Sequence, residues 1–394
     1  MNNTVLQPVN ILVVDDEPDL ELLILQKFRK KISGNEYSFQ FAKNGVEALD
    51  IISNNSTINL VLTDINMPVM DGLTLLSKIN ELKNKILRSI IVSAYGDMEN
   101  IRTAMNRGAY DFITKPINLK DLEITIEKSL HEIELYKQAI LSREKLIAFQ
   151  QELKIASLIQ TSILPKKFPA FPERNEFDIY AKMIPAKEVG GDLYDFFLID
   201  KYRLGVIIGD VSGKGIAAAM LMAVCKTLLK ATALNGIPTD NILYEVNNIL
   251  VNESPMGMFV TVFYGIFDTR NGSFEYTNGG HNLPFLISND GEVKQLENIG
   301  GLLLGAMKNV EYQSIIISIK PGESLILYTD GITETFNENN EEFEEKRLVK
   351  TLKNKNELSA NEIVNSIISE VQNYSNGNIQ SDDITCLALK YLRK

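Results

Sequence analysis

The sequence has 394 residues, more than the ~250 to 300 at which one hydrophobic core stops growing, so we expect two domains. Hydrophobic residues make up 45% and charged residues 23% of the chain, a balance typical of globular proteins rather than of disordered or fibrous ones. The formal net charge of −11 argues against direct nucleic-acid binding, because such binding needs a basic surface that displaces counterions.

The first residues lack the basic region and apolar core of a signal peptide. No apolar run in the sequence approaches the ~18 residues that a membrane-spanning helix needs. Two cysteines, Cys225 and Cys386, allow neither a disulfide framework nor a cysteine metal cluster. We therefore expect a cytoplasmic protein with no membrane segment, whose thiols are reduced and buried.

Residues 1–125 alternate between short apolar runs rich in β-branched residues and amphipathic helical patterns. Strands are predicted near residues 10–14, 38–41, 59–63, 89–92 and 110–113. Helices are predicted near residues 18–32, 45–53, 72–82 and 97–106, and from 118 onward. This repeated alternation predicts an α/β domain with a parallel, five-stranded, doubly wound sheet.

Polar side chains follow the predicted strands at the edge where such a sheet binds ligands. Asp15 and Asp16 follow the first strand, Asp64 follows the third, Ser93 ends the fourth, and Lys115 follows the last. Carboxylates held close together repel one another unless a cation lies among them, and Mg²⁺ prefers oxygen ligands. The pattern therefore favours a Mg²⁺ site over a set of independent, solvated loop residues.

This segment resembles the receiver domain of response regulators, through the motifs LVVDDEP, LTDINMPVMDG, VSAYG and DFITKP. The resemblance implies that a cognate histidine kinase phosphorylates Asp64. It also implies that Asp15 and Asp16 help Asp64 to hold Mg²⁺, with the main-chain carbonyl of Asn66 as a further ligand. Phosphoryl transfer of this kind needs positioning and charge neutralisation more than covalent machinery.

The resemblance also covers the residues that respond to phosphorylation. Ser93 is expected to hydrogen-bond the phosphoryl oxygens, and Lys115 to pair with their charge. Phe112, three residues before Lys115, occupies the aromatic switch position of the family. The Lys115–Pro116 peptide bond is expected to be cis, as it is in that family.

The connector, residues 126–164, is predicted to be helical because neither glycine nor proline occurs between Leu119 and Ile163. Its largely apolar seam has the 4–3 spacing typical of a two-stranded coiled coil, although Ser142 and Gln160 weaken it. The seam comprises positions 135, 139, 142, 146, 149, 153, 156, 160 and 163. Two readings remain open: a homodimer formed through this helix, or packing of one helix face on the chain's own domains.

Between residues 165 and 394 the pattern changes to consecutive strands with few helices. Strands are predicted near residues 177–184, 202–210, 259–268, 272–278, 283–288, 312–320, 323–330 and 384–392. Helices are predicted near residues 215–234, 239–252 and 360–374. This order predicts an α+β domain in which two antiparallel sheets pack together between helices, an α-β-β-α sandwich.

Aspartates beside glycine, or beside another acid, recur at the ends of these strands: Asp192, Asp210, Asp330, Asp382 and Asp383. One such aspartate would be an ordinary turn residue, but several together form the kind of cluster that binds two Mn²⁺ or Mg²⁺ ions. Neighbouring glycines let main-chain carbonyls approach an ion as further ligands. Zinc is not expected, because the chain has only two histidines.

The motifs GGDLYD, GDVSGKGIAAA, NGGHNLP, LYTDGITE and SDDIT resemble the SpoIIE-type branch of the metal-dependent, type 2C-like Ser/Thr protein phosphatases. The resemblance implies four catalytic aspartates. Asp210 would bridge two metal ions. Asp192 and the carbonyl of Val211 would complete one metal site, and Asp330 and Asp382 would complete the other.

The sequence differs from the eukaryotic relatives of this family in two places. Ser212 stands where they carry a histidine that acts as general acid, so the leaving group would be protonated by water at the metals or by the substrate's surroundings. Gly191 stands where they carry an acid that makes an outer metal contact. Asp383 is the alternative to Asp382 as metal ligand, and His281 is interpreted as ordering its loop rather than as catalytic.

The order of receiver, helix and phosphatase predicts a two-component response regulator whose output is dephosphorylation of a phosphoserine or phosphothreonine protein. Phosphorylation of Asp64 would reposition the receiver on the connector helix and change whether the second domain holds both metals. The family alone points to an anti-anti-sigma-type substrate. The alternative is an adaptor that binds a regulator through a non-catalytic phosphatase-like domain. A transcription factor is disfavoured because no basic recognition helix follows residue 125.

Overall fold

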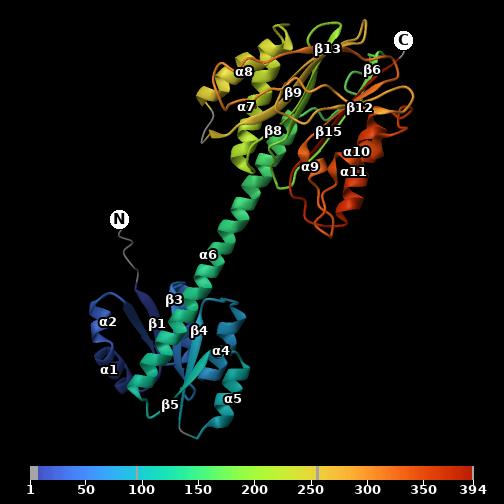
Figure 1. Ribbon diagram of the computed structural model, residues 1–394. Helices are drawn as coiled ribbons and strands as arrows, with labels where there is room; N and C mark the ends of the chain where they lie inside the picture. The colour runs from blue at the N-terminus through green and yellow to red at the C-terminus, as the bar shows by residue number, and fades with distance from the viewer. Residues whose placement is uncertain (1–7, 95, 254–256, 393–394) are drawn as a thin grey trace. The chain divides into compact units, whose positions relative to one another are not determined.

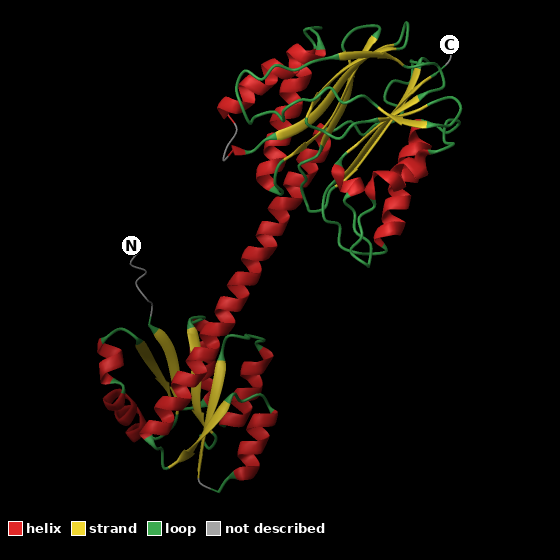
Figure 2. Ribbon diagram, in the orientation of Figure 1, coloured by secondary structure: helices red, strands yellow, loops and turns green. Residues whose placement is uncertain are grey.

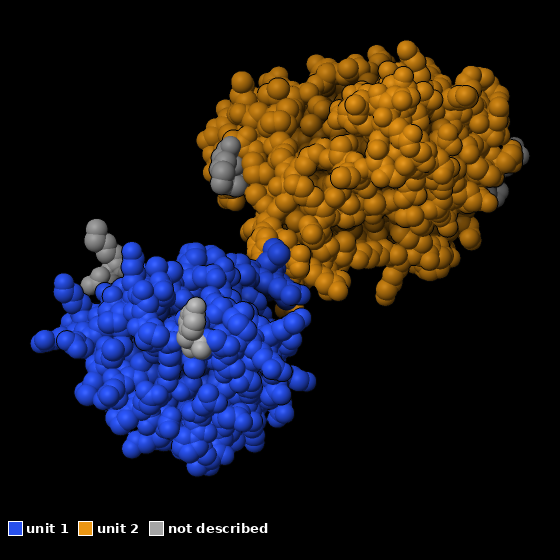
Figure 3. All heavy atoms as spheres, turned by 90° about the horizontal axis from the view of Figure 1, so that it is seen from below, with its two compact units in different colours: residues 1–148 blue, residues 149–394 orange. Residues whose placement is uncertain are grey.

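The computed structural model describes residues 8–94, 96–253 and 257–392. Its contacts divide the chain into two compact units, Met1–Ala148 and Phe149–Lys394, which are coloured separately in Figure 3. The first unit contains one sheet flanked by helices, and the second contains two sheets with helices (Figures 1 and 2). The fold class predicted from the sequence is confirmed for both.

The first unit is a parallel sheet with strand order β2-β1-β3-β4-β5. Its strands are β1 (Val9–Val14), β2 (Tyr37–Ala42), β3 (Ile58–Asp64), β4 (Arg88–Ala94) and β5 (Asp111–Lys115). Its helices are α1 (Pro18–Lys27), α2 (Arg29–Ser33), α3 (Gly45–Asn54), α4 (Gly72–Glu81) and α5 (Met98–Asn106). The single helix predicted near 18–32 is interrupted at Phe28, whose ring is buried and whose backbone leaves helical geometry.

Strand register fixes the carboxyl edge of this sheet. Asp64 ends β3 opposite Val92 of β4, and Lys115 ends β5 opposite Ala94 of β4. Parallel strands that end together bring the residues following them to one edge. Asp64, Lys115 and the residues after β1 therefore share that edge.

Helix α6 (Leu119–Ile163) is continuous over 45 residues. Its first turns join the core of the first unit through Leu122 and Ile126, whereas residues 141–152 are all exposed. The predicted apolar seam therefore has two different halves. Positions 135–149 of the seam are exposed, and positions 153–163 are partly or fully buried in the second unit.

The second unit holds two antiparallel sheets with strand orders β13-β10-β9-β8-β7 and β12-β11-β14-β15-β6. The strands are β6 (Phe177–Ile184), β7 (Leu193–Leu198), β8 (Arg203–Val211), β9 (Val260–Asp268), β10 (Ser273–Gly279), β11 (Phe285–Ile287), β12 (Val293–Gln295), β13 (Ile315–Ser318), β14 (Ser324–Tyr328) and β15 (Ile384–Tyr391). The helices are α7 (Ile216–Ala233), α8 (Thr239–Glu253), α9 (Asp330–Thr333), α10 (Glu344–Leu352) and α11 (Ala360–Ser375).

Three apolar layers hold these elements together. Phe263, Phe274 and Leu387 belong to the layer between the two sheets. Helices α7 and α8 pack on the outer face of the first sheet, and α10 and α11 pack on the outer face of the second (Figure 1). This is the predicted α-β-β-α sandwich.

Strand β7 was not among the predicted strands. Its side chains are buried on both faces, because Tyr194 points into the layer between the sheets while Leu193 packs under α7. Asp195 interrupts its apolar pattern in the sequence. That carboxylate is 1% exposed and pairs with Lys226 of α7 at 2.9 Å, so a buried ion pair stands where an apolar residue would be expected.

Helix α7 is long and apolar enough, by length and composition, to cross a membrane, which corrects the expectation that no segment would be. In this fold it is a core helix. Ala218, Met222, Cys225 and Leu229 are fully buried against the sheet, and α7 also carries the ion-paired Lys226.

Candidate metal centres

Three carboxylates meet at the carboxyl edge of the first sheet. Asp15, Glu17 and Asp64 each offer an oxygen within 4.8 Å of the other two. Lys115 contacts all three, at 3.1 Å from Asp15, 3.1 Å from Glu17 and 2.8 Å from Asp64. Burial raises the pKa of Asp15, although the main-chain N–H of Glu17 and the Lys115 ammonium oppose that rise. Such clustered oxygen donors fit Mg²⁺.

The structure brings together only part of the predicted receiver site. Asp15, Asp64 and Lys115 are in contact, whereas Asp16 is exposed and lines an adjoining pocket of about 390 Å³. Glu17, which was not among the predicted ligands, belongs to the carboxylate group. Asn66 is exposed.

The predicted switch residues lie on β4 and β5, the last two strands in the order of the sheet. Ser93 is 1% exposed, and its hydroxyl donates to Asp97 at 3.4 Å rather than to Asp64. Phe112 is 38% exposed, so its ring is open to solvent. The Lys115–Pro116 peptide bond is cis, as the family resemblance implied. Burial alone would lower the pKa of Lys115, but its hydrogen bonds to Asp64 and Asp15 raise it.

A second group of acids lies in the sandwich, and Asp192 is its most buried member. Asp192 precedes β7, and one of its oxygens accepts hydrogen bonds from Thr329 at 2.8 Å and Thr385 at 2.5 Å. Its pKa is raised well above the usual range, chiefly by burial and then by the charge of Asp210. The two threonines hold the carboxylate in one orientation.

Asp210, near the end of β8, faces the other acids of the group. Burial, followed by the charges of Asp330 and Asp382, raises the pKa of Asp210 to about 7. Burial and the charge of Asp382 likewise raise the pKa of Asp330. Partly buried carboxylates that repel one another in this way are a donor set suited to hard divalent cations. The main-chain oxygen of Val211 and a carboxylate oxygen of Asp210 both lie close to Gly191, at 2.8 Å and 3.2 Å from where its β-carbon would be.

Asp382 and Asp383 are adjacent but engage different partners. Asp383 is buried, and its carboxylate accepts main-chain N–H groups from Ala186 at 2.8 Å and Gly191 at 2.6 Å. Asp382 is partly exposed and pairs with Lys214 at 2.8 Å. The oxygens of Asp383 therefore order the loop before Asp192, while those of Asp382 remain on the side of the acidic group.

Close backbone approach explains the glycines of these motifs. A β-carbon on Gly190 would lie 2.2 Å from an oxygen of Asp383, and one on Gly331 would lie 2.0 Å from the main-chain oxygen of the same residue. Neither distance is compatible with a side chain. The glycines are thus required for the segments carrying Asp192, Asp330 and Asp382 to meet.

Two residues that contact this site were missed as site residues. Lys214 had no assigned role in the motif GDVSGKG. Gln160 of α6 was interpreted as a weak coiled-coil position, which is wrong: its amide is buried and bonded to Gly190. Neither residue shows a local sequence signal, because each partner lies at least 30 residues away in the chain.

His281 and Ser212 have structural partners. One ring nitrogen of His281 lies 2.9 Å from the hydroxyl of Thr261 and the other lies 3.1 Å from the main-chain oxygen of Tyr328. This pairing fits the loop-ordering role predicted for His281. The hydroxyl of Ser212 accepts the main-chain N–H of Phe259 at 2.9 Å, so it anchors the loop that follows β8.

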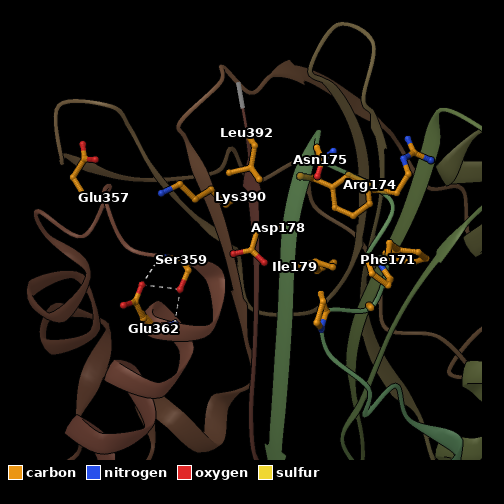
Figure 4. Close-up of a pocket in the computed structure, with 14 residues that line it drawn as sticks. Phe171, Arg174, Asn175, Asp178, Ile179, Glu357, Ser359, Glu362, Lys390 and Leu392 are labelled. Carbon is orange, nitrogen blue, oxygen red and sulfur yellow. Dashed lines mark hydrogen bonds between the residues drawn. The ribbon is translucent and has the colours of Figure 1, made fainter. Parts of the chain in front are cut away.

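A pocket of about 520 Å³ lies elsewhere in the unit, beside β6 (Figure 4). Its polar side chains already have protein partners. Ser359 and Glu362 cap helix α11, Asp178 accepts the main-chain N–H of Ala360, and Lys390 donates to the carbonyls of residues 356 and 358. The acidic group, and not this pocket, therefore carries the candidate chemistry.

Two families match the chain, one in each unit. Residues 11–127 match the response regulator receiver domain, and residues 200–392 match stage II sporulation protein E (SpoIIE). Both matches agree with the folds described above.

Two curated relatives each match well over half of this chain. Protein IcfG of Synechocystis sp. is 32% identical over 265 residues, which cover 60% of this chain but only 41% of IcfG. Phosphoserine phosphatase RsbU of Bacillus subtilis is 30% identical over 260 residues, covering 65% of this chain and 76% of RsbU.

A solved structure supports the fold. The SiaA-PP2C domain of Pseudomonas aeruginosa matches with a TM-score of 0.55 and 21% identity, over 63% of this chain and 98% of that domain. The chain therefore belongs to the SpoIIE family of metal-dependent, type 2C-like Ser/Thr phosphatases, and it carries a response regulator receiver domain ahead of the family's own domain.

Proposed function

We propose that this chain hydrolyses phosphoserine or phosphothreonine on a protein substrate, using two Mn²⁺ or Mg²⁺ ions held by Asp192, Asp210, Asp330 and Asp382. The observation that carries the proposal is the gathering of these acids from four separate segments, with the pKa values of three of them raised by burial and mutual repulsion. Carboxylates held at such a cost in stability are typical of functional sites.

Each residue has a defined part in this proposal. Asp210 bridges the two ions, and Asp192 and the carbonyl of Val211 complete one site. Asp330 and Asp382 complete the other. When bound, the ions supply an activated water and neutralise charge on the phosphoryl oxygens.

The neighbouring side chains position these ligands. Thr329 and Thr385 fix the orientation of Asp192 through hydrogen bonds. Asp383 holds the loop of Gly191, and we assign it this supporting role rather than that of a ligand.

We further propose that the receiver controls this activity. A histidine kinase phosphorylates Asp64, with Mg²⁺ held by Asp15, Asp16, Asp64 and the carbonyl of Asn66. Ser93, Phe112 and Lys115 respond to the new phosphoryl group. The bond between Gln160 of α6 and Gly190 supports control through the connector helix, because Gly190 lies two residues before Asp192.

The proposal also includes the class of substrate. The name of RsbU, a phosphoserine phosphatase, supports a phosphoserine protein as substrate, and the family points to an anti-anti-sigma-type protein.

The exposed seam residues Leu135, Leu146 and Phe149 support a homodimer formed by a coiled coil over this part of α6. The acidic net charge of −11 supports a protein that binds neither nucleic acid nor an anionic membrane surface directly.

One experiment tests the activity and its control together. Phosphate release from a phosphoserine peptide is measured with Mn²⁺, for the parent chain and Asp210→Ala, with and without acetyl phosphate. We expect Mn²⁺-dependent release that Asp210→Ala abolishes and that acetyl phosphate alters. Absence of release by the parent chain, with the peptide bound, would instead favour a non-catalytic adaptor.

A further inference from the structure

Lys214 reaches into the acidic group from the loop between β8 and α7, four residues after Asp210. Its ammonium lies 2.8 Å from a carboxylate oxygen of Asp382 and donates to the carbonyl of Ser381 at 2.6 Å. Its side chain is 43% exposed. The lysine therefore approaches the acids from the solvent side, from which a substrate would also arrive.

Lys214 supplies a positive charge that the site otherwise lacks. Within residues 8–94, 96–253 and 257–392, no other lysine or arginine forms an ion pair with the acids of this group: Asp192, Asp210, Asp330, Asp382 and Asp383. Two divalent ions balance only four of these five carboxylates. Glu334 adds another negative charge close to Asp330. A phosphomonoester carries a charge of about −1.5 to −2 at pH 7, so one more cation would strengthen its binding.

The loop that carries Lys214 is flanked by glycines and borders open space. Gly213 and Gly215, on either side of it, have φ angles of 91° and 84°, in the region that favours glycine. A β-carbon on Gly215 would meet no other atom within 4 Å, so the loop borders open space. The ammonium is a compact point charge on a flexible stem, which suits a phosphoryl group whose position changes during reaction.

We propose that Lys214 binds the phosphoryl group of the substrate at this site. The inference rests on the phosphatase function proposed above and adds a substrate-binding residue to it. The competing explanation is purely structural: Lys214 would tie its loop to Ser381 and Asp382 and have no contact with substrate. The two explanations differ in what happens to phosphate binding when metal binding is intact.

The test is calorimetric titration of inorganic phosphate into the full-length chain loaded with Mn²⁺. We expect Lys214→Met to weaken phosphate binding about tenfold, the size of one charge-assisted hydrogen bond, and Lys214→Arg to retain most of the affinity. Lys187→Met is the matched control, because it removes an equal charge from an exposed position on the loop before Gly190. It should leave the phosphate affinity unchanged.

Steady-state kinetics test the role of Lys214 independently of calorimetry. Lys214→Met should raise KM for a phosphoserine peptide by a factor similar to the loss of phosphate affinity, with a smaller effect on kcat. The proposal is overturned if Lys214→Met binds phosphate like the parent chain, if it loses Mn²⁺ binding itself, or if Lys187→Met causes the same loss. A parent chain that binds Mn²⁺ and phosphate but releases none from the peptide would refute the phosphatase function and not the phosphate site.

Discussion

Gln160 and Gly190 form a reciprocal pair of hydrogen bonds. The side-chain amide of Gln160 donates to the carbonyl of Gly190 at 2.5 Å, and the N–H of Gly190 donates back to the amide oxygen at 3.1 Å. Gln160 is 5% exposed, so these bonds are shielded from water. The connector helix is thus bonded directly to the loop that carries Asp192.

Replacing Gln160 by leucine should therefore weaken metal binding. The substitution leaves two buried main-chain groups of Gly190 unpaired, at a cost of about 1–3 kcal/mol for each group. We expect Mn²⁺ affinity to fall about tenfold or more, and the response to acetyl phosphate to be lost. Calorimetry with Mn²⁺ measures the first effect, and Gln151→Leu, at an exposed position of the same helix, is the control. Unchanged affinity in Gln160→Leu would show that the helix does not reach the metal site by this route.

Replacement by asparagine should affect metal binding at Asp382 but protein stability at Asp383. Asp382→Asn should abolish binding of one metal ion while leaving the free energy of unfolding of the metal-free protein nearly unchanged. Asp383→Asn should instead lower that free energy by about 1–3 kcal/mol, because the acceptors for Ala186 and Gly191 are disturbed. Urea unfolding and Mn²⁺ titration of both variants separate the two roles, and a reversed pattern would exchange the assignments.

Removing the charge of Asp210 should stabilise the metal-free protein at pH 8. The pKa of Asp210 is raised to about 7 by burial and by Asp330 and Asp382, so the folded protein binds more protons than the unfolded chain between about pH 4 and 7. The stability of the metal-free protein should therefore fall as the pH rises through this window.

Thermal unfolding with and without metal checks this expectation. The parent chain should gain about 2.7 kcal/mol when Mn²⁺ is present at a hundred times its dissociation constant. Asp210→Asn should show a higher Tm without metal and little gain with it. A lower Tm for metal-free Asp210→Asn would contradict the repulsion described above.

The buried His281 should make the stability of the protein depend on pH in the opposite direction to Asp210. Burial lowers the pKa of His281 to about 4, from an ordinary value near ~6.5. Between these values the unfolded chain binds the extra proton, so stability is lost as the pH falls from about 6.5 towards 4. A shift of this size corresponds to at most ~3 kcal/mol.

The variant His281→Gln isolates this effect, because glutamine cannot take up the proton. We expect the variant to be less stable than the parent chain at pH 7.5, with a smaller difference at pH 5. Urea unfolding at the two pH values measures it. An equal difference at both pH values would mean that folding does not lower the pKa of His281.

The exposed half of the α6 seam should control oligomeric state. Leu146 and Phe149 are 56% and 52% exposed, and charges at both positions should prevent a coiled coil from forming. Light scattering should detect a dimer for the parent chain and a monomer for the double variant Leu146→Asp, Phe149→Asp. Gln150→Asp, an exposed neighbour outside the seam, should not change the mass. A monomeric parent chain would remove the dimer from the proposal.

The sequence was sufficient to predict both folds, because parallel and antiparallel sheets leave different local patterns. It also identified acids at strand ends, where topology alone brings them together, as Asp15 and Asp64 illustrate. Glu17 was missed because it looks like an ordinary exposed residue before α1, and only its contact with Lys115 reveals its place.

Residues whose role depends on a distant partner could not be predicted. Thr329 and Thr385 look like ordinary residues at strand ends, and their shared bond to Asp192 spans more than 130 positions of the chain. Gln160 looked like a polar interruption of a coiled-coil seam. Hydrophobic periodicity does not distinguish a polar helix residue that faces a second helix from one that is buried against a loop. Asp195 concealed β7 for the same reason, as its partner Lys226 lies on a different element.

The close contacts of Gly190 and Gly331 with Asp383 have a consequence for divergence within the family. Both glycines press against Asp383, so a single added methyl group at either position would push apart the segments that carry the ligands. A homologue could keep every aspartate and still have lost the ability to gather them. Descendants that have lost catalysis should therefore be recognisable first by alanine or serine at these two positions, before any acidic residue has disappeared.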